Sequence, residues 1–335
     1  MSVLSIPCPM PGQQAGMPGF LAYLENSLRN PFVLDLQGRS LMEVIHACAN
    51  TKSKLHPNYR ASIGCLTHNL ERLEREYNVA LQPIQITDIF WGYFISFCQQ
   101  RGLRASSITT MCSQLRSILN WASKYNATVS PTYGDFDVPK VRNQEIALTA
   151  DEVSRITYFD IDRFYSNRRS DFRETMRRVR DMFVLSCNLG QRHSDMIRIE
   201  PSCFDRNIFR ITQQKTGNAA VVDIDKYSLS AKTTYRILER YGHTAPYKAT
   251  IGNYNYYLHI LMKDIGLTDV VRVEERVNGV LVTENIPKWK MIASHTARRT
   301  FVTVNILRGK NIHAVKRCTG HSDLRHLEGY VRDED

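Results

Sequence analysis

The chain has 335 residues and a formal net charge of +11, and 43% of its residues are hydrophobic while 23% are charged. This composition is typical of a soluble globular protein, and the length suffices for two domains that each bury a core. No apolar run approaches the roughly 20 residues of a membrane-spanning helix, and Pro and Gly interrupt the first 20 residues too often for a signal peptide. We therefore expect a cytoplasmic protein. Its positive charge favours a polyanionic partner, most commonly nucleic acid.

The first part of the sequence predicts an arm followed by a helical domain. Residues 1–36 have little periodicity beyond one amphipathic piece around Phe20 and Leu24. Residues 37–130 show helical periodicity, with Ser106 and Ser107 as candidate N-caps of the last helix. Four apolar faces follow one another: Leu41, Val44, Ile45 and Cys48; Ile63, Leu66, Leu70 and Leu73; Phe90, Tyr93, Phe94 and Phe97; and Ile108, Met111, Cys112, Leu115, Ile118, Leu119 and Ala122. Four helices with short connections predict a small all-α domain.

Residues 131–147 have turn residues and no period, which predicts an interdomain linker. A new helix is expected to open at Thr149, which forms a capping box with Glu152. A later helix is expected to end at Gly190, and two alternating segments, 207–214 and 220–224, predict strands joined by a hairpin turn at Lys215.

Helices are expected over the rest of the second domain, residues 148–335. Their expected ends are Gly242, Gly266, Gly309 and Gly320, and their expected N-caps are Ser294, Asn311 and Ser322. The whole chain is thus predicted to be mainly α with a small antiparallel β-sheet.

Eight cysteines are scattered through the chain without a C-x-x-C pair or a zinc-ligand spacing. They predict buried, reduced thiols and no metal site.

Chemistry-bearing residues gather in the C-terminal half. The segments are Leu189-Gly-Gln-Arg192-His-Ser-Asp195, then Lys215 at the hairpin, Ser294-His295-Thr-Ala-Arg298, and Thr319-Gly320-His321 with Tyr330 nine residues later. His295 and Arg298 are three residues apart at a predicted helix start, so both side chains can project from one face. With Ser294 as N-cap, the helix N-terminus would favour an anion at the same place.

These residue types are those that DNA strand cleavage without a metal requires. Arginines suit the non-bridging phosphate oxygens, because the guanidinium fork donates paired, permanently charged hydrogen bonds. A tyrosine nucleophile, with an unperturbed pKa of about 10, needs help to lose its proton, and a histidine suits that task. A lysine can protonate the leaving 5′ oxygen.

The segments G-x-R-x-S-D, H-x-x-R and G-H, with a Tyr nine residues further on, resemble the tyrosine recombinase (phage integrase) family. The resemblance covers residues 148–335, and Lys215 matches the hairpin lysine of that family. Less specifically, the helical region resembles the family's core-type DNA-binding domain in its SAM-like bacterial version. The resemblance implies a two-domain architecture that acts on double-stranded DNA with inverted-repeat core sites, as a dimer per site and a homotetramer on paired sites, without cofactor.

The resemblance also implies a role for each matching residue. Arg192, Arg298, His295 and His321 would bind the scissile phosphate, and His295 would also take part in proton transfer with the Tyr330 hydroxyl. Lys215 would be the general acid, and Asp195 would orient Arg192. Tyr330 would form a 3′-phosphotyrosyl link that another strand's 5′ hydroxyl reverses.

Further DNA contacts are predicted from short polar and basic residues in the first domain and from one arginine beside the site. They are Lys52, Lys54, Arg60, Ser106, Thr109, Arg116 and Arg299. The arginine-rich run 168–180 is mixed with acids, so it fits a solvated helix face as well as phosphate contact.

Three alternatives stay open. A type IB topoisomerase would use the same chemistry as a monomer. A metal-dependent nuclease or transposase would need acidic ligands, for which the D-x-D pairs at 160–162 and 223–225 are candidates, the second expected on one face of a strand. A DNA-binding protein that has lost catalysis would not retain all six reactive residues.

Two departures from the family pattern affect how subunits communicate. Only five residues follow Tyr330, so coupling between subunits is expected to use the N-terminal arm or the helix bearing Tyr330. The arm looks too short for a separate arm-site-binding domain, which favours a recombinase acting at core sites alone, such as an inversion, resolution or transposon enzyme.

Overall fold

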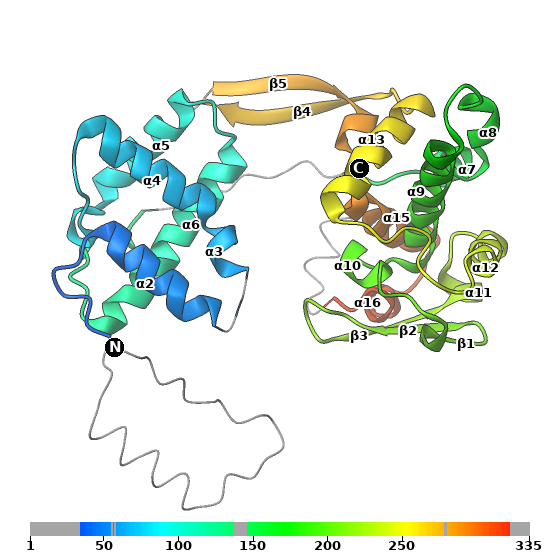
Figure 1. Ribbon diagram of the computed structural model, residues 1–335, viewed down its shortest axis with the longest axis horizontal. Helices are drawn as coiled ribbons and strands as arrows, with labels where there is room; N and C mark the ends of the chain where they lie inside the picture. The colour runs from blue at the N-terminus through cyan, green and yellow to red at the C-terminus, as the bar shows by residue number, and fades with distance from the viewer. Residues whose placement is uncertain (1–33, 55, 57, 137–145, 278–279, 322–335) are drawn as a thin grey trace, which may run out of the picture. The chain divides into compact units, whose positions relative to one another are not determined.

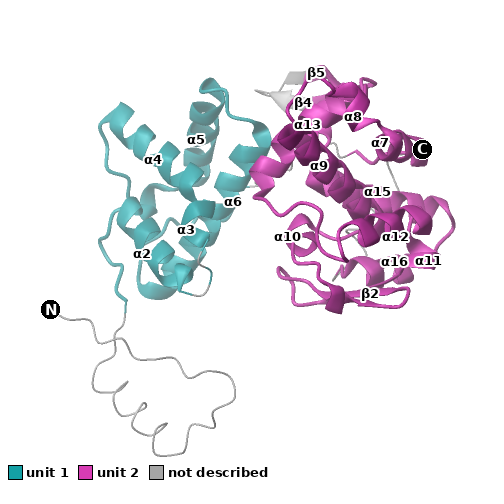
Figure 2. Ribbon diagram, turned by 45° about the vertical axis from the view of Figure 1, so that its right-hand side comes forward, with its two compact units in different colours: residues 1–142, 276–281 teal, residues 143–275, 282–335 magenta. Residues whose placement is uncertain are grey.

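The computed structural model describes residues 34–54, 56, 58–136, 146–277 and 280–321, and of residues 275–277 and 280–281 the backbone alone (Figure 1). Two compact units divide the chain, as the colours of Figure 2 show. The first comprises residues 1–142 with 276–281, and the second comprises residues 143–275 with 282–335. The predicted fold class, mainly α with a small antiparallel sheet, is confirmed.

The first unit is all-α over its described residues outside 276–281. Its α-helices are α2 (Leu41–Ser53), α3 (Tyr59–Ser62), α4 (Gly64–Tyr77), α5 (Asp88–Gln100) and α6 (Ala105–Ala122), with 3₁₀ turns η1 (Pro83–Gln85) and η2 (Ser123–Tyr125). The predicted faces of α2, α4 and α6 form one core, into which Trp91 is also fully buried. Burial of these faces supplies the main stabilisation of such short helices.

The predicted buried face of α5 is confirmed for Phe94 and Phe97 and was wrong for Tyr93. Trp91, Phe94, Phe97 and Cys98 are buried, whereas Tyr93 is 72% exposed. The physical reason is that Trp91 brings the largest apolar surface on this helix, and its indole N–H also donates to the carbonyl oxygen of Tyr133 at 3.3 Å. The helix is therefore oriented with Trp91 towards the core.

Three expected boundaries of the first unit also differ. Arg104, without a side-chain cap, precedes α6, so Ser106 and Ser107 lie inside its first turn rather than at the N-cap. The expected linker of 131–147 begins later, because Phe136 stacks on Trp91 with 5.5 Å between ring centroids. At the other end, Leu36 already belongs to this core, so the arm expected at 1–36 ends earlier. The amphipathic piece around Phe20 lies outside the described residues.

The second unit contains ten α-helices, the three-stranded sheet and most of the two-stranded sheet among its described residues. The helices are α7 (Ala150–Tyr158), α8 (Ile161–Phe164), α9 (Ser170–Leu189), α10 (His193–Met196), α11 (Ile224–Tyr227), α12 (Ala231–Arg240), α13 (Ile251–Asp264), α14 (Lys288–Met291), α15 (Ser294–Leu307) and α16 (Ile312–Thr319), with a 3₁₀ turn η3 (Pro201–Cys203). The capping box of Thr149 with Glu152 opens α7 as predicted, and Asn311 caps α16.

Helix α9 is the centre of the second unit. It contacts α7, α12, α13 and α15, and its C-terminal half is buried continuously from Asp181 to Leu189. A helix that is buried all round in this way is a core element rather than a surface helix. Its C-terminus therefore gives a fixed point from which a site can be built.

A three-stranded sheet lies beside α16, in the order β1 (Phe204–Asp205), β2 (Ile208–Thr212) and β3 (Ala219–Asp223). β2 and β3 pair antiparallel, with Ile208 opposite Asp223 and Thr212 opposite Ala219. The predicted hairpin is thus confirmed.

A second, two-stranded sheet lies in a region where the sequence pattern predicted helices. Its strands are β4 (Val270–Val277) and β5 (Val280–Pro287). The signal was present, since two segments rich in valine flank Asn-Gly, the strongest short-range hairpin signal in a sequence.

Gly190 ends α9 in the left-handed conformation, at φ +67°, and the chain passes close to a core aromatic ring there. A Cβ at this position would lie 2.5 Å from Cδ1 of Phe301, a ring that is fully buried. Gly190→Ala is therefore expected to lower the free energy of unfolding by about 2–4 kcal/mol, from left-handed strain and overpacking together. Urea denaturation measures the loss.

Gly309→Ala is the matched control, because φ is +72° there and no atom lies within 4 Å of the added Cβ. It should cost about 1 kcal/mol from the backbone strain alone. Equal losses in the two variants would show that the contact with Phe301 is not the cause.

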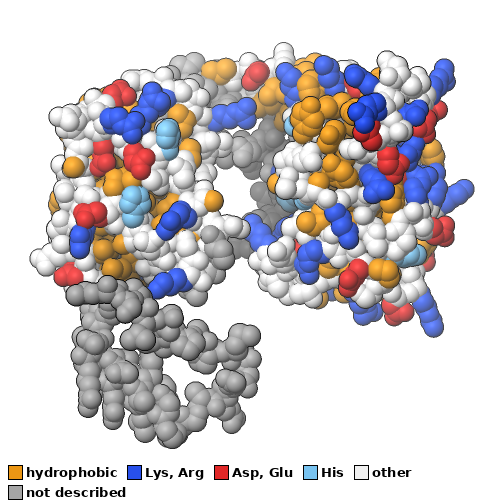
Figure 3. Space-filling model, in the orientation of Figure 1, with side chains coloured by type: hydrophobic (Ala, Val, Ile, Leu, Met, Phe, Trp, Pro, Cys, Tyr) orange, Lys and Arg blue, Asp and Glu red, His pale blue; other side chains and the backbone are white. Residues whose placement is uncertain are grey.

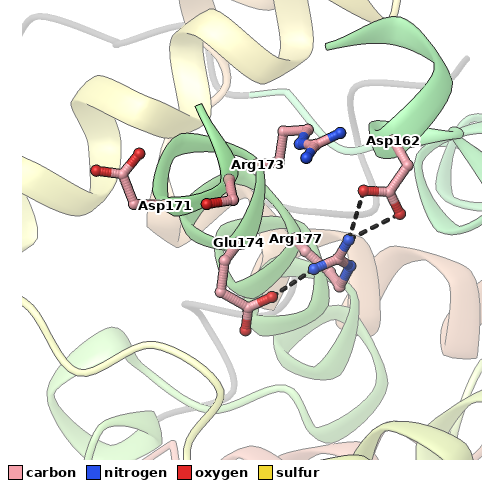
Figure 4. Close-up of a pocket in the computed structure, with 6 residues that line it drawn as sticks. Asp162, Asp171, Arg173, Glu174 and Arg177 are labelled. Carbon is pink, nitrogen blue, oxygen red and sulfur yellow. Dashed lines mark hydrogen bonds and ion pairs between the residues drawn. The ribbon is translucent and has the colours of Figure 1, made fainter. Parts of the chain in front are cut away.

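The arginine-rich run of α9 is engaged in ion pairs. Arg177 donates twice to the carboxylate of Asp162, at 2.8 Å each, and also pairs with Glu174, as Figure 4 shows in the surface hollow that these residues line. Arg178 also pairs with Glu174 at 2.8 Å. These ion pairs favour a solvated, internally paired face of α9 over phosphate contact.

The exposed surface carries the positive charge of the chain. On the face that Figure 3 shows, Lys and Arg side chains are numerous over the second unit and interleaved with acidic ones.

No helix among the described residues is long and apolar enough to cross a membrane. Five of the cysteines in the described segments are buried and free, whereas Cys65 is exposed and Cys203 is partly so.

Candidate active site

Arg192 stands directly after the C-terminus of α9. The left-handed turn at Gly190 redirects the chain, and Arg192 then takes the N-cap position of α10 with extended backbone angles. The side chain is partly buried, and its Nη1 donates to Oε1 of Gln213 at 2.6 Å. The guanidinium is therefore tethered at one nitrogen to the hairpin of β2 and β3.

Asp195 is fully buried, and one oxygen of its carboxylate binds the hairpin, while its role in orienting Arg192 stays a prediction. Its Oδ1 accepts from the backbone N–H of Gln214 at 2.8 Å, and it lies 3.5 Å from Nη1 of Arg198. Arg192 donates to Gln213. Asp195 thus fixes the hairpin backbone one residue before Lys215.

Lys215 is exposed in the turn that joins β2 to β3. The N–H of Gln213 donates to the Asn218 carbonyl and the N–H of Gly217 donates to the Gln213 carbonyl, both at 2.9 Å. Gly217 supplies the positive φ, +68°, that closes this turn. The geometry presents the lysine at the end of a short, well-bonded hairpin.

The first turn of α15 carries both His295 and Arg298. Ala293 rather than Ser294 is at the N-cap, so the expected cap was wrong: Ser294 is the first helical residue, and its N–H donates to Oδ1 of Asn255 at 2.9 Å. A side chain from α13 already satisfies this N–H, which weakens the expected anion site at the helix end. Arg299 follows on the same helix and is partly exposed.

Arg298 is the most buried charge of the site, with 0% of its surface exposed. Its Nη1 donates to the Gly190 carbonyl at 3.1 Å, and its Nη2 lies 3.0 Å from Nε2 of His321. The arginine therefore joins the end of α9 to His321, the second residue after α16.

The contact with Arg298 determines which nitrogen of His321 acts as an acceptor. A guanidinium only donates, so Nε2 of His321 accepts from Nη2 of Arg298 at 3.0 Å. Nδ1 of the same ring lies 2.7 Å from the Thr319 hydroxyl oxygen, which is also 2.9 Å from the Val315 carbonyl oxygen.

The positively charged residues near His295 set its electrostatic environment. Although the His295 ring is exposed, crowding by protein atoms and then the positive charges of Arg299, Arg298, Arg192 and Lys215 lower its pKa to about 4. Both effects disfavour a second proton on the ring. His295 is therefore neutral near pH 7, the state in which it can accept a proton.

A titration of the DNA-free protein tests this environment. The ring signals of His295 in an NMR spectrum are expected to titrate with a midpoint near 4, well below the ordinary value of about 6.5. Lys215→Met should move the midpoint upward, because it removes one of the neighbouring positive charges. A midpoint near 6.5 in the unmodified protein would contradict the clustering.

Tyr330 lies outside the described residues. Its position relative to Arg298 and His321 therefore stays a prediction, as do the roles of all six residues in catalysis. The structure brings Arg192, Lys215, His295 and Arg298 into one neighbourhood, with His321 against Arg298.

The predicted DNA contacts of the first unit are placed unevenly. Ser106 and Thr109 lie in the first turns of α6. Lys52 and Lys54 stand at the end of α2, and the Nζ of Lys52 lies 5.0 Å from the centroid of the Tyr59 ring. Arg60 of α3 donates to Oδ1 of Asn50, and Arg116 is partly buried near the middle of α6.

The acidic pairs proposed for a metal-dependent alternative have structural partners. Asp223 ends β3 and caps α11, while Asp225 lies inside α11 and accepts from the Tyr235 hydroxyl at 2.9 Å. The expectation that both stand on one face of a strand was therefore wrong. Asp160 caps α8, and Asp162 binds Arg177.

Sequence comparison finds no match: neither a family model nor a curated protein sequence corresponds to this chain. Solved structures do match. A lambda integrase dimer bound to a COC′ core site has a TM-score of 0.63 at 16% identity, with 95% of this chain and 87% of that chain covered. The Tn1549 transposon integrase in complex with transposon right end DNA has a TM-score of 0.60 at 14% identity, covering 87% and 94%. The XerH site-specific recombinase bound to palindromic difH substrate has a TM-score of 0.57 at 13% identity, covering 83% and 79%.

The similarity spans most of each chain, so the molecule has the two-domain fold of the tyrosine recombinases. The resemblance stated from the sequence motifs is confirmed at this level. Because the identities are 13–16%, the particular reaction has to be argued from the site itself.

Proposed function

We propose that this chain is a site-specific DNA recombinase that cleaves and rejoins DNA strands through a 3′-phosphotyrosyl bond to Tyr330. The observation that carries the proposal is that hydrogen bonds join the segments that bear the reactive residues: Arg192 donates to Gln213 of the Lys215 hairpin at 2.6 Å, and Nη2 of Arg298 lies 3.0 Å from Nε2 of His321. Crowding by protein atoms and the positive charges of Arg298, Arg192 and Lys215 also lower the pKa of His295. Three positive charges suit a phosphate on which negative charge builds up. A nearby proton acceptor suits a nucleophile that has to lose its proton.

The proposed step begins with attack of the Tyr330 oxygen on the scissile phosphorus. His295 receives the phenolic proton, and the negative charge on the non-bridging oxygens is bound by Arg192, Arg298 and His321. The bond from phosphorus to the 5′ oxygen breaks, and Lys215 gives that oxygen a proton. The free 5′ hydroxyl of another strand can then reverse the step, because the phosphotyrosyl bond retains the phosphodiester energy.

The likeness to DNA-bound structures supports the choice of partner. The structures similar to this chain include a lambda integrase tetramer bound to a Holliday junction, with a TM-score of 0.60 at 16% identity, and XerH on a palindromic substrate. For this chain we propose double-stranded DNA with inverted-repeat core sites, a dimer per site and a homotetramer on paired sites. Action within the nucleoid, on a mobile element, follows from that partner.

The test begins with selection of bound duplexes from a random-sequence library by the full chain. A nicked duplex of the selected sequence is then incubated with the protein in EDTA, and the products are separated under denaturing conditions. A protein band covalently joined to the 3′ DNA end, with the modified peptide containing Tyr330, supports the proposal. A strict metal requirement, or cleavage without an adduct, would overturn it, and relaxation by a monomer without sequence preference would indicate a topoisomerase instead.

A further inference from the structure

A buried cluster of amides lies behind Arg192, and neither the proposed reaction steps nor the sequence motifs account for it. Gln213 and Gln191 are 1% and 0% exposed. Nε2 of Gln191 donates to the carbonyls of Leu189 at 2.7 Å and Cys318 at 2.8 Å. Gln191 therefore joins the end of α9 to the end of α16.

Gln213 makes contacts on both sides of its amide. Nε2 donates to the Thr319 carbonyl at 2.6 Å and to Oε1 of Gln191 at 3.2 Å. Oε1 accepts from Nη1 of Arg192 at 2.6 Å and from the Thr216 hydroxyl at 3.0 Å. Two donated and two accepted bonds use the full capacity of a side-chain amide, so the group is held in one orientation.

The close approach of α16 to this amide needs glycine. Gly320, at φ +63°, follows the helix, and a Cβ there would lie 2.8 Å from Cδ and from Nε2 of Gln213. The carbonyl of Gly320 also accepts from Nδ2 of Asn218 at 3.3 Å. The backbone that leads into His321 therefore passes directly over the Gln213 amide.

These contacts make Gln213 the junction of three segments that each carry a reactive residue. The α9–α10 connection carries Arg192, the β2–β3 turn carries Lys215, and His321 follows Gly320 after the end of α16. A chain segment that moved alone would break a bond to Gln213. The buried amide thus couples the relative positions of all three.

We propose that Gln213 is a positioning residue for DNA strand cleavage: its neutral amide orients Arg192 toward the scissile phosphate and sets the Lys215 turn and His321 in register with it. The inference rests on the proposed function. A neutral acceptor suits this task, because a carboxylate in the same place would orient Arg192 but also compensate the positive charge that the phosphate needs.

The first experiment compares Gln213→Leu with the unmodified full chain on the nicked duplex of the selected sequence. Adduct formation in a single turnover should slow about 10- to 100-fold, the range typical for loss of a group that orients a reactive side chain. The Kd for the duplex should change less than about threefold, because most DNA affinity comes from many phosphate contacts elsewhere. Asn207→Ala is the matched control, since Asn207 bonds Asp223 at 3.0 Å at the opposite end of the same strand pair.

The second experiment uses Gln213→Glu and keeps the test valid if the leucine variant does not fold. Protonated glutamic acid can donate to the Thr319 carbonyl and accept from Arg192, as the amide does. The ionised carboxylate has no hydrogen to donate, so two acceptor oxygens would face each other at the Thr319 carbonyl. The ratio of the variant rate to the unmodified rate should therefore rise as pH falls. If Gln213 served only the stability of the fold, the ratio of the two rates would not change with pH at temperatures where both proteins are fully folded.

The outcomes separate the two ideas. If the unmodified protein forms no adduct, the proposed function fails and the inference falls with it. If the unmodified protein forms an adduct and Gln213→Leu forms it at the same rate, or Asn207→Ala slows it equally, the inference alone is overturned. A pH-independent ratio for Gln213→Glu would overturn it as well.

Discussion

Tyr330→Phe is expected to abolish the covalent adduct completely and to leave binding to the selected duplex nearly intact. Phenylalanine retains the ring but has no oxygen with which to attack phosphorus. One lost hydroxyl accounts for about 1 kcal/mol of binding at most, or roughly a fivefold change in Kd. Adduct is measured on denaturing gels and binding by fluorescence anisotropy.

Tyr256→Phe is the matched control for this change. Tyr256 lies on α13 in the second unit and is 62% exposed, and it has no part in the proposed step. It should retain the adduct at the unmodified rate. An adduct that survives in Tyr330→Phe would refute the assignment of the nucleophile and leave another tyrosine to be found by peptide mapping.

Lys215→Met should slow cleavage of an ordinary duplex by about 10²- to 10⁴-fold, the range for loss of a general acid. The methionine side chain has similar length but no proton to give. If the bridging 5′ oxygen at the cleaved phosphate is replaced by sulfur, the leaving thiolate needs no proton, because thiols are far stronger acids than alcohols. The variant should then cleave the sulfur substrate at close to the unmodified rate.

The control for that experiment is Lys226→Met, which removes an exposed lysine of α11 in the same unit. It should cleave both substrates normally. If Lys215→Met is equally slow on the oxygen and sulfur substrates, the lysine stabilises the phosphate charge and some other group protonates the leaving oxygen.

The sequence predicted the β2–β3 hairpin and α16, because each of these two elements has a strong local signal. The β2–β3 hairpin has alternating strands and a Lys-Thr-Gly-Asn turn, and α16 has a capping asparagine and a terminal glycine. Such signals act over a few residues and do not need the rest of the fold.

The missed features depend on tertiary packing. The buried face of α5 follows from the accommodation of Trp91 against Phe136, a residue far along the chain. The N-terminus of α15 depends on Asn255 of another helix, so Ser294 looked like a cap although its N–H has a side-chain partner. Periodicity within one helix carries no information about such partners.

Gln213 is an intermediate case. It continues the alternation of Phe209 and Ile211, which are both buried on the same side of β2, so the pattern alone could have indicated an inward-facing amide. Its partners Arg192 and Thr319 are 21 and 106 residues away, respectively. No short-range pattern predicts those bonds.

The low pKa of His295, about 4, has a consequence for the thermodynamics of DNA binding. A phosphate bound among Arg192, Arg298 and Lys215 offsets part of the positive charge that lowers this pKa, so binding raises it toward the ordinary value. Between these two values, association with DNA is then accompanied by proton uptake, and affinity grows as pH falls through that window because the coupling is reciprocal. Calorimetric binding enthalpies at pH 5.5 should therefore depend on the ionisation enthalpy of the buffer, which makes the histidine a reporter of how far a phosphate has entered the site.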